Sequence, residues 1–202
     1  MEQMKTDLCY VISHGFAARM LFQTGLISQL LDRGLSIAII TPDANDENLD
    51  EYRHLPQMQI FGSQEKTNIW EDDYNFKRKY YLEDIKANPA LWEKHVYSIW
   101  YSSSKHPWKR VRPLFYYLAY ALNKYFPSIR SNFAKKEHQY LQSTEAQQVI
   151  EQIQPRLVVS TYPVNLLEAK TLFAAQQKNI PTLLHLLSWD NITTKGLSLI
   201  HI

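Results

Sequence analysis

The sequence predicts an α/β protein whose mostly parallel sheet carries helices on both faces. Strand and helix patterns alternate at each end of the chain, which is typical of parallel sheets with crossover helices. Between these two stretches lies a segment of helical periodicity interrupted by several prolines. We therefore expect the two ends to build one sheet and the middle to form a helical insert.

The first stretch is a strand–helix–strand unit. Residues 8–12 are apolar, with β-branched and aromatic members, which is typical of a buried strand. Apolar residues at helical spacing follow between Phe16 and Leu31, and Gly34 stands where a helix C-terminal cap is expected. A second strand is expected at 36–40, which completes a unit of βαβ size.

The same alternation returns later in the chain. Further strands are expected at residues 58–61, 157–160 and 182–187, and helices at 146–153 and 165–178. The insert covers about residues 75–131, and its prolines are expected to separate its helices: Pro89, Pro107, Pro113 and Pro127. We expect one domain over residues 1–196. Residues 197–202 are apolar without a turn or cap, and we expect a truncated or non-native tail there.

Composition indicates a globular protein of the cytoplasm. The 202 residues are 45% hydrophobic and 21% charged, enough for one full domain. Cys9 is the single cysteine, so a disulfide framework is excluded and a reducing compartment is expected. The polar N-terminus carries no secretory signal, and the longest apolar run, 114–122, is about half of the ~20 residues that a membrane span needs.

Charge and aromatic residues are distributed unevenly. Residues 1–75 hold 5 basic and 12 acidic side chains, whereas residues 76–126 hold 10 basic and 3 acidic ones. The second segment also contains 14 of the 26 aromatic residues. One interpretation is a surface for anionic lipid or a phosphate-bearing acceptor, with peripheral contact at the inner face of the membrane. The other is a helical subdomain with an aromatic core and a solvated basic face. We expect no nucleic-acid partner.

Candidate site residues follow the strands, because loops at the carboxyl ends of parallel strands meet at one edge of the sheet. Ser13, His14 and Gly15 follow the first strand. Gly15 is expected to allow a tight turn into the helix, whose free N–H groups could bind an anion or a sugar hydroxyl. His14 is either a general base for an acceptor hydroxyl or a solvated loop histidine. Thr161 belongs to the loop after the strand at 157–160.

The loop after the last strand concentrates polar residues. Asp190 or Asn191 could hydrogen-bond a sugar with Trp189 as an apolar platform, and Lys195 belongs to the same loop. The alternative is an Asx turn that ends the strand, with the indole packed in the core. The histidines show no metal-binding spacing, so no metal site is expected.

Two stretches resemble bacterial glycosyltransferase-like proteins of the two-domain GT-B type, which act in surface-polysaccharide synthesis. They are V-I-S-H-G-F-A-A-R at residues 11–19 and the more specific S-W-D-N-I-T-T-K-G at residues 188–196. The resemblance extends over about residues 5–60 and 145–196 and does not include the insert. It implies a Rossmann-like domain that holds the acceptor. It also implies a second such domain, beyond this chain, that binds the nucleotide-sugar without an obligatory metal.

The resemblance further implies that the loops containing Ser13, His14 and Gly15, and containing Trp189, Asp190 and Asn191, line the cleft, with His14 as the catalytic base. We therefore expect the acceptor-side half of a glycosyltransferase acting on a polysaccharide or lipid-linked acceptor. This chain alone is expected to be inactive and to bind no cofactor. The alternatives are a CDP-glycerol-type polyol-phosphate transferase, a nucleotide-sugar epimerase on the same fold, or a non-catalytic binding protein.

Overall fold

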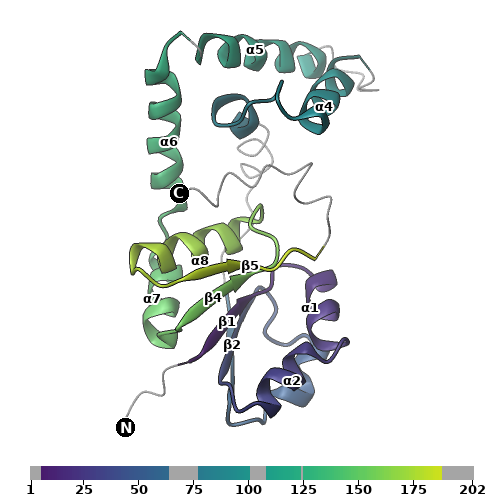
Figure 1. The fold of residues 1–202 in the computed structure, drawn as a ribbon, viewed down its shortest axis with the longest axis vertical. Helices are drawn as coiled ribbons and strands as arrows, with labels where there is room; N and C mark the ends of the chain where they lie inside the picture. The colour runs from purple at the N-terminus through teal and green to yellow at the C-terminus, as the bar shows by residue number, and fades with distance from the viewer. Residues whose placement is uncertain (1–5, 64–76, 101–107, 124, 188–202) are drawn as a thin grey trace. The chain divides into compact units, whose positions relative to one another are not determined.

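The chain forms two compact units, each described here by itself (Figure 1). The computed structural model describes residues 6–63, 77–100, 108–123 and 125–187. The sheet unit comprises the described residues 6–63 and 141–187. The helical unit comprises the described residues between 77 and 140.

Five strands form one all-parallel sheet in the order β3-β2-β1-β4-β5. They are β1 (Leu8–Val11), β2 (Ile37–Thr41), β3 (Met58–Gly62), β4 (Leu157–Ser160) and β5 (Thr182–Leu184). The sheet confirms the predicted α/β class and its Rossmann-like arrangement. The expected strand limits hold to within one residue, except that β5 ends at Leu184 instead of 187. Leu184 pairs with Ser160, which is the last residue of β4, so β4 offers no further residue with which the chain after Leu184 could pair.

Helices cover both faces of the sheet, as predicted. On one face lie α1 (Gly15–Phe22), α2 (Leu26–Asp32) and the 3₁₀ helix η1 (Glu47–Tyr52), packed on a cluster that includes Tyr10 and Ile39. On the other face lie α7 (Thr144–Ile153) and α8 (Leu166–Gln177), packed on a cluster that includes Cys9 and Ala38 (Figure 1). Neighbouring strand residues point to opposite faces, so β1, β2, β3 and β4 each contribute to both cores.

The helix predicted between Phe16 and Leu31 is two helices. Gly25 precedes α2 with a φ of 73°, a left-handed conformation that glycine adopts without steric cost. This residue therefore ends the first helix and redirects the chain into the second. Gly34, at a φ of 81°, follows α2 as the sequence predicts, and its backbone N–H donates to the Leu31 carbonyl at 2.8 Å.

The helical unit contains helical residues 77–81 and three longer helices. These are α4 (Pro89–Trp100), α5 (Trp108–Asn123) and α6 (Pro127–Leu141), so the helices extend beyond the predicted limit of 131. Pro89 and Pro127 begin helices, where the missing N–H costs nothing. Pro113, in contrast, lies inside α5 and does not interrupt it. Pro107 lies outside the described residues.

The core of the helical unit is aromatic and contains a buried ion pair. Tyr80, Ile85 and Leu91 are buried together, and tyrosines of α5 pack against them. Arg78 is buried as well, and its Nε donates to Glu137 Oε1 at 2.6 Å. This pair links residues 77–81 to α6, so part of the basic and aromatic character of the segment is structural.

Candidate functional site

The sheet has one point where successive connections leave in opposite directions. The strands β1 and β4 are adjacent and parallel, but α1 packs on one face of the sheet and α8 on the other. The loops after the two strands therefore diverge at the carboxyl edge, and open α/β sheets bind ligands in the crevice that is expected at such a point. Ser13 and His14 follow β1 at this point, and Thr161 follows β4.

A fully buried carboxylate holds these two loops together. Glu168 lies in the first turn of α8 and is 0% exposed. Its Oε1 accepts hydrogen bonds from the backbone N and Oγ of Ser13, at 3.1 and 2.5 Å. Its Oε2 accepts from Ser160 Oγ at 2.6 Å and from the backbone N of Thr161 and Tyr162, at 2.8 and 2.6 Å. Bonds to a carboxylate are among the strong hydrogen bonds of proteins, so Glu168 fixes both loops.

Ser13 and Thr161 face this carboxylate. Thr161 is 1% exposed, and its Oγ1 donates to Glu168 Oε1 at 3.1 Å. The two side chains therefore position the loops, and a direct contact between either of them and a substrate stays a prediction.

His14 is the N-cap of α1. Its backbone is extended, and its Nδ1 accepts a hydrogen bond from the backbone N of Ala17 at 3.1 Å. In a neutral imidazole the nitrogen that accepts carries no proton, so the proton is on Nε2. His14 thus offers an N–H donor in this arrangement. For Nε2 to remove a proton from a hydroxyl, the imidazole must first give up the cap.

The surroundings of His14 combine an aromatic ring and open space. The centroid of the Tyr162 ring lies 5.2 Å from that of His14. A Cβ atom added at Gly15 meets no atom within 4 Å, and Gly15 is not among the glycines of positive φ. The exit from β1 into α1 therefore does not use the left-handed conformation that favours glycine. Gly15 instead leaves free space beside the first turn of α1.

Glu168 is not among the site residues predicted from the sequence. Asn165 and Glu168 have the spacing of a capping box, which suggests a local role at the start of α8. Asn165 does cap this helix, because its Oδ1 accepts from the backbone N of Leu167 at 2.9 Å. Glu168 instead bonds to Ser13, which is 155 positions away in the sequence. An acidic residue within the apolar run L-L-E-A was the available signal.

Four predicted site residues lie outside the described residues: Trp189, Asp190, Asn191 and Lys195. The tail at 197–202 also lies outside them. The structure therefore brings together Ser13, His14, Gly15 and Thr161 at one edge of the sheet.

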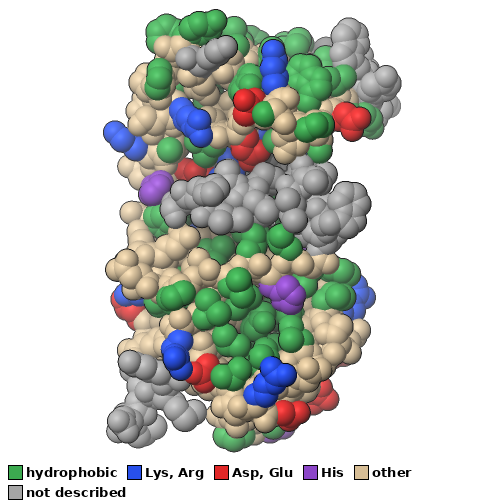
Figure 2. Space-filling view, in the orientation of Figure 1, with side chains coloured by type: hydrophobic (Ala, Val, Ile, Leu, Met, Phe, Trp, Pro, Cys, Tyr) green, Lys and Arg blue, Asp and Glu red, His purple; other side chains and the backbone are tan. Residues whose placement is uncertain are grey.

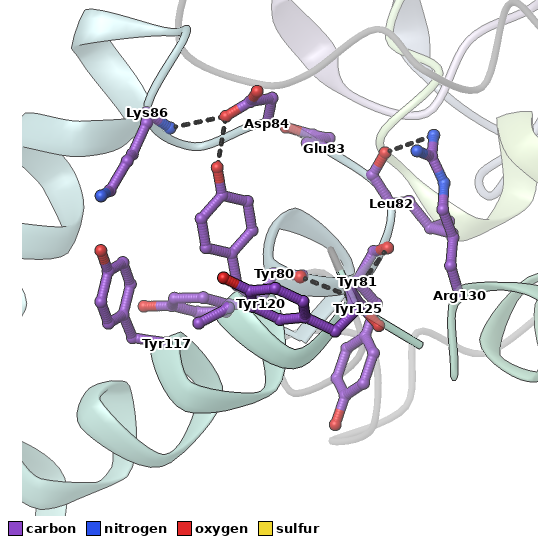
Figure 3. Close-up of a pocket in the computed structure, with 12 residues that line it drawn as sticks. Tyr80, Tyr81, Leu82, Glu83, Asp84, Lys86, Tyr117, Tyr120, Tyr125 and Arg130 are labelled. Carbon is purple, nitrogen blue, oxygen red and sulfur yellow. Dashed lines mark hydrogen bonds between the residues drawn. The ribbon is translucent and has the colours of Figure 1, made fainter. Parts of the chain in front are cut away.

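The helical unit holds a separate cavity of about 740 Å³ (Figure 3). Most of its wall is aromatic and polar, and includes Tyr80, Tyr81, Asp84, Lys86, Tyr117, Tyr120, Tyr125 and Arg130. The Tyr120 hydroxyl points at Asp84 and donates to its Oδ1 at 2.5 Å. Arg130 donates from Nη2 to the Leu82 carbonyl at 3.1 Å. Rings, hydroxyls and charges of both signs suit a polyhydroxylated molecule better than a strongly charged one.

The hydrogen bond between Tyr120 and Asp84 shifts the pKa values of both side chains. Burial, assisted by this bond to the carboxylate, raises the pKa of Tyr120 to about 12. The same bond is the main cause that lowers the pKa of Asp84. The phenol therefore remains protonated and the carboxylate ionised over the physiological pH range, which keeps this part of the wall fixed.

Two chemical features are absent from the part of the chain that the structure describes. No group of three or more histidine, cysteine, aspartate or glutamate side chains there is placed to hold a metal ion. Among the same residues, no helix is both long and apolar enough to cross a membrane.

Comparisons of the chain with protein-family models, with curated protein sequences and with solved structures gave no significant match.

Proposed function

We propose that this chain is the acceptor-side part of a GT-B-type glycosyltransferase, which moves a sugar from a nucleotide-sugar to a saccharide or lipid-linked acceptor. The observation that carries the proposal is the meeting of two loops at the carboxyl ends of the adjacent strands β1 and β4, where we place the acceptor crevice. There His14 and the first turn of α1 lie beside the Tyr162 loop, and Glu168 holds both loops. The resemblance of residues 11–19 and 188–196 to GT-B proteins supports the same function.

The crevice supplies groups that suit a sugar. The N–H groups of Ala17 and Ala18 bond to His14, whereas those of Gly15 and Phe16 precede the first helical hydrogen bond. The open space beside Gly15 would let a hydroxyl approach these two groups. The Tyr162 ring offers an apolar surface for the C–H face of a sugar. His14 would contribute its Nε2 proton as a hydrogen-bond donor while it caps α1.

In the transfer itself the acceptor oxygen forms a bond to the anomeric carbon of the donor. The bond from that carbon to the phosphate oxygen breaks, and the nucleoside diphosphate leaves. The acceptor hydroxyl must lose its proton, and we propose that His14 receives it after its Nδ1 has released Ala17. The nucleotide-sugar would be bound outside the sheet unit.

Ligand binding tests the proposal directly. Saturation-transfer NMR on the 202-residue chain would use panels of mono- and disaccharides and of nucleotide-sugars, together with CDP-glycerol and NAD. We expect binding of at least one saccharide, which Gly15→Val weakens at least tenfold because the new side chain fills the open space. His14→Asn keeps the helix cap and serves as the conservative variant.

Other outcomes would assign other functions. Tight binding of NAD with a nucleotide-sugar, sensitive to Gly15→Val, would indicate an epimerase. Binding of CDP-glycerol with the same sensitivity would indicate a polyol-phosphate transferase. If Gly15→Val changed the binding of none of these probes, the crevice would not be the site and the proposal would fail.

A further inference from the structure

The helix α5 presents its apolar side chains outward. Phe115, Leu118 and Leu114 are 60%, 57% and 50% exposed, and Val111 and Leu122 are exposed as well. These five residues are called the α5 ridge below. Each lies three or four positions from another member, with Leu114 and Phe115 side by side, which places them on one face of the helix. Tyr125 and Phe126, just after the helix, are also exposed.

The face of α5 that packs on the helical unit is built from tyrosines instead. Tyr116, Tyr117 and Tyr120 pack against the core residues Tyr80 and Leu91. The Tyr80 and Tyr116 rings lie 5.8 Å apart, and those of Tyr117 and Tyr120 are separated by the same distance. The aromatic face of α5 thus packs on the core, and the ridge is an exposed apolar face outside the core cluster of the described residues.

The segment that contains the ridge is basic, and one acidic residue, Asp84, lies beside α5, where it accepts a hydrogen bond from Tyr120. From Lys94 to Lys136 the sequence contains nine lysines and arginines and no aspartate or glutamate. Among the described ones, Arg130 and Lys135 are exposed, and Arg112 is half-buried on α5 itself. Figure 2 shows hydrophobic side chains together with lysine and arginine over this unit. The surroundings therefore attract a negatively charged partner.

We infer that the α5 ridge lies in the surface of an anionic membrane. Apolar side chains on one helix face enter the boundary between headgroups and acyl chains, while the basic residues bind the anionic headgroups. A membrane fits both features, since the ridge is apolar and the chain from Lys94 to Lys136 contains basic residues and no acidic ones. This inference does not depend on the proposed enzymatic function, because it concerns another part of the molecule and a different readout.

The experiment uses the 202-residue chain and two kinds of vesicle: phosphatidylcholine alone, and phosphatidylcholine mixed with phosphatidylglycerol. Co-sedimentation should be strong only with the mixed vesicles and should fall as salt rises, because screening weakens the attraction of exposed charges. The double substitution Leu114→Ser with Leu118→Ser should reduce partitioning at least tenfold. Lys109→Gln with Arg110→Gln, at the start of α5, should reduce the salt dependence.

The matched control is Leu55→Ser. Leu55 is an exposed leucine of the sheet unit, 37% exposed, and its replacement should leave partitioning unchanged. Circular dichroism of each variant establishes that it is folded. Both ridge leucines are exposed, so their substitution should not disturb the core.

Three results would overturn the inference. The first is no binding to the anionic vesicles at low salt, and the second is unchanged binding of the folded double-leucine variant. The third comes from sedimentation velocity. If the wild-type chain forms a dimer that the double-leucine substitution dissociates, the ridge is an interface between two copies of this chain and not a membrane surface.

Discussion

At the scale of single residues, Glu168 is the side chain on which the candidate site depends most. It is fully buried, and the chain segments that it joins are far apart in the sequence. Three of its donors are backbone N–H groups, at Ser13, Thr161 and Tyr162, which cannot be satisfied by rotating a side chain. Any replacement that removes an acceptor oxygen leaves at least one buried donor unpaired.

Glu168→Gln should therefore destabilise the sheet unit by about 3 kcal/mol, because in either orientation the new amide NH₂ faces at least one backbone N–H group, which can only donate. Hydrogen exchange of the amides of β1 and β4 measures this loss. Glu151→Gln is the control, because Glu151 is largely exposed although it pairs with Lys178 at 2.6 Å. That change should cost less than about 1 kcal/mol. Equal protection in the wild type and Glu168→Gln would contradict the assigned role.

Lys79 makes the stability of the helical unit depend on pH. It is buried, and this burial, with the charge of Lys94, lowers the pKa of its ammonium group to about 8. The unfolded chain keeps the ordinary value of 10.5, so between these two values the unfolded state binds more protons than the folded one. The stability of the helical unit should therefore rise as pH increases from about 8 towards 10.

This rise can be measured by urea unfolding at about pH 7 and about pH 9.5, with Lys79→Met as the comparison. Trp92, Trp100 and Trp108 lie in α4 and α5, so tryptophan fluorescence follows the helical unit. The wild type should gain stability at the higher pH by about 1–2 kcal/mol, and Lys79→Met should gain much less. An equal gain in both proteins would show that another group titrates.

At the scale of elements, the break between α1 and α2 rests on the backbone conformation of one glycine. Gly25 and Gly15 both have room for a Cβ atom, since neither would bring it within 4 Å of another atom. They differ in backbone conformation, because Gly25 alone of the two has a positive φ, of 73°. Steric space is thus matched and conformation is the only variable, which makes the pair a controlled comparison.

Gly25→Ala should destabilise the sheet unit by about 1 kcal/mol, the usual cost of a left-handed conformation for an alanine. Gly15→Ala should be neutral or stabilise slightly, because alanine fits a first helical turn and restricts the unfolded chain. Thermal unfolding followed by circular dichroism compares the two variants. A larger loss for Gly15→Ala would mean that the loop after β1 needs glycine for its conformation.

At the scale of the whole molecule, the proposed function requires two substrates held together. Holding donor and acceptor in reactive geometry can contribute ~7–11 kcal/mol to barrier lowering. The proposal places the donor site outside the sheet unit, so the 202-residue chain should transfer sugar from a nucleotide-sugar no faster than the uncatalysed background. Enzymatic turnover by this chain, measured with radiolabelled nucleotide-sugars, would refute the proposed separation of the donor site from the acceptor site.

In a protein that also contains the donor site, His14→Ala should lower kcat by roughly 10²–10⁴-fold if His14 accepts the proton. His14→Asn retains an acceptor for the Ala17 amide and so separates helix capping from proton transfer. If His14→Ala folds normally and keeps its full kcat, His14 is not the base. Such a result would not affect the description of the fold or of the hydrogen bonds by which Glu168 joins the loops after β1 and β4.

The sequence by itself determined the strands and their class. Buried strands of a parallel sheet are continuous apolar runs, so β1, β2, β3 and β4 could be located to within one residue. It also located Ser13 and His14 at a carboxyl end, because this follows from chain order in a parallel sheet. The split between α1 and α2 was missed, since a glycine within a helical pattern does not reveal its φ.

Only the tertiary structure decided what Glu168 does and which face of α5 is inside. The role of Glu168 depends on strand order, which brings β1 and β4 together across a long stretch of sequence. In α5, periodicity shows that Leu114, Leu118 and Leu122 share one face, but not whether that face is buried. The tyrosines face inward because they pack with Tyr80 in an aromatic core, and the leucines are left outside. Local sequence records which residues share a face, whereas the surfaces available for packing decide which face is covered.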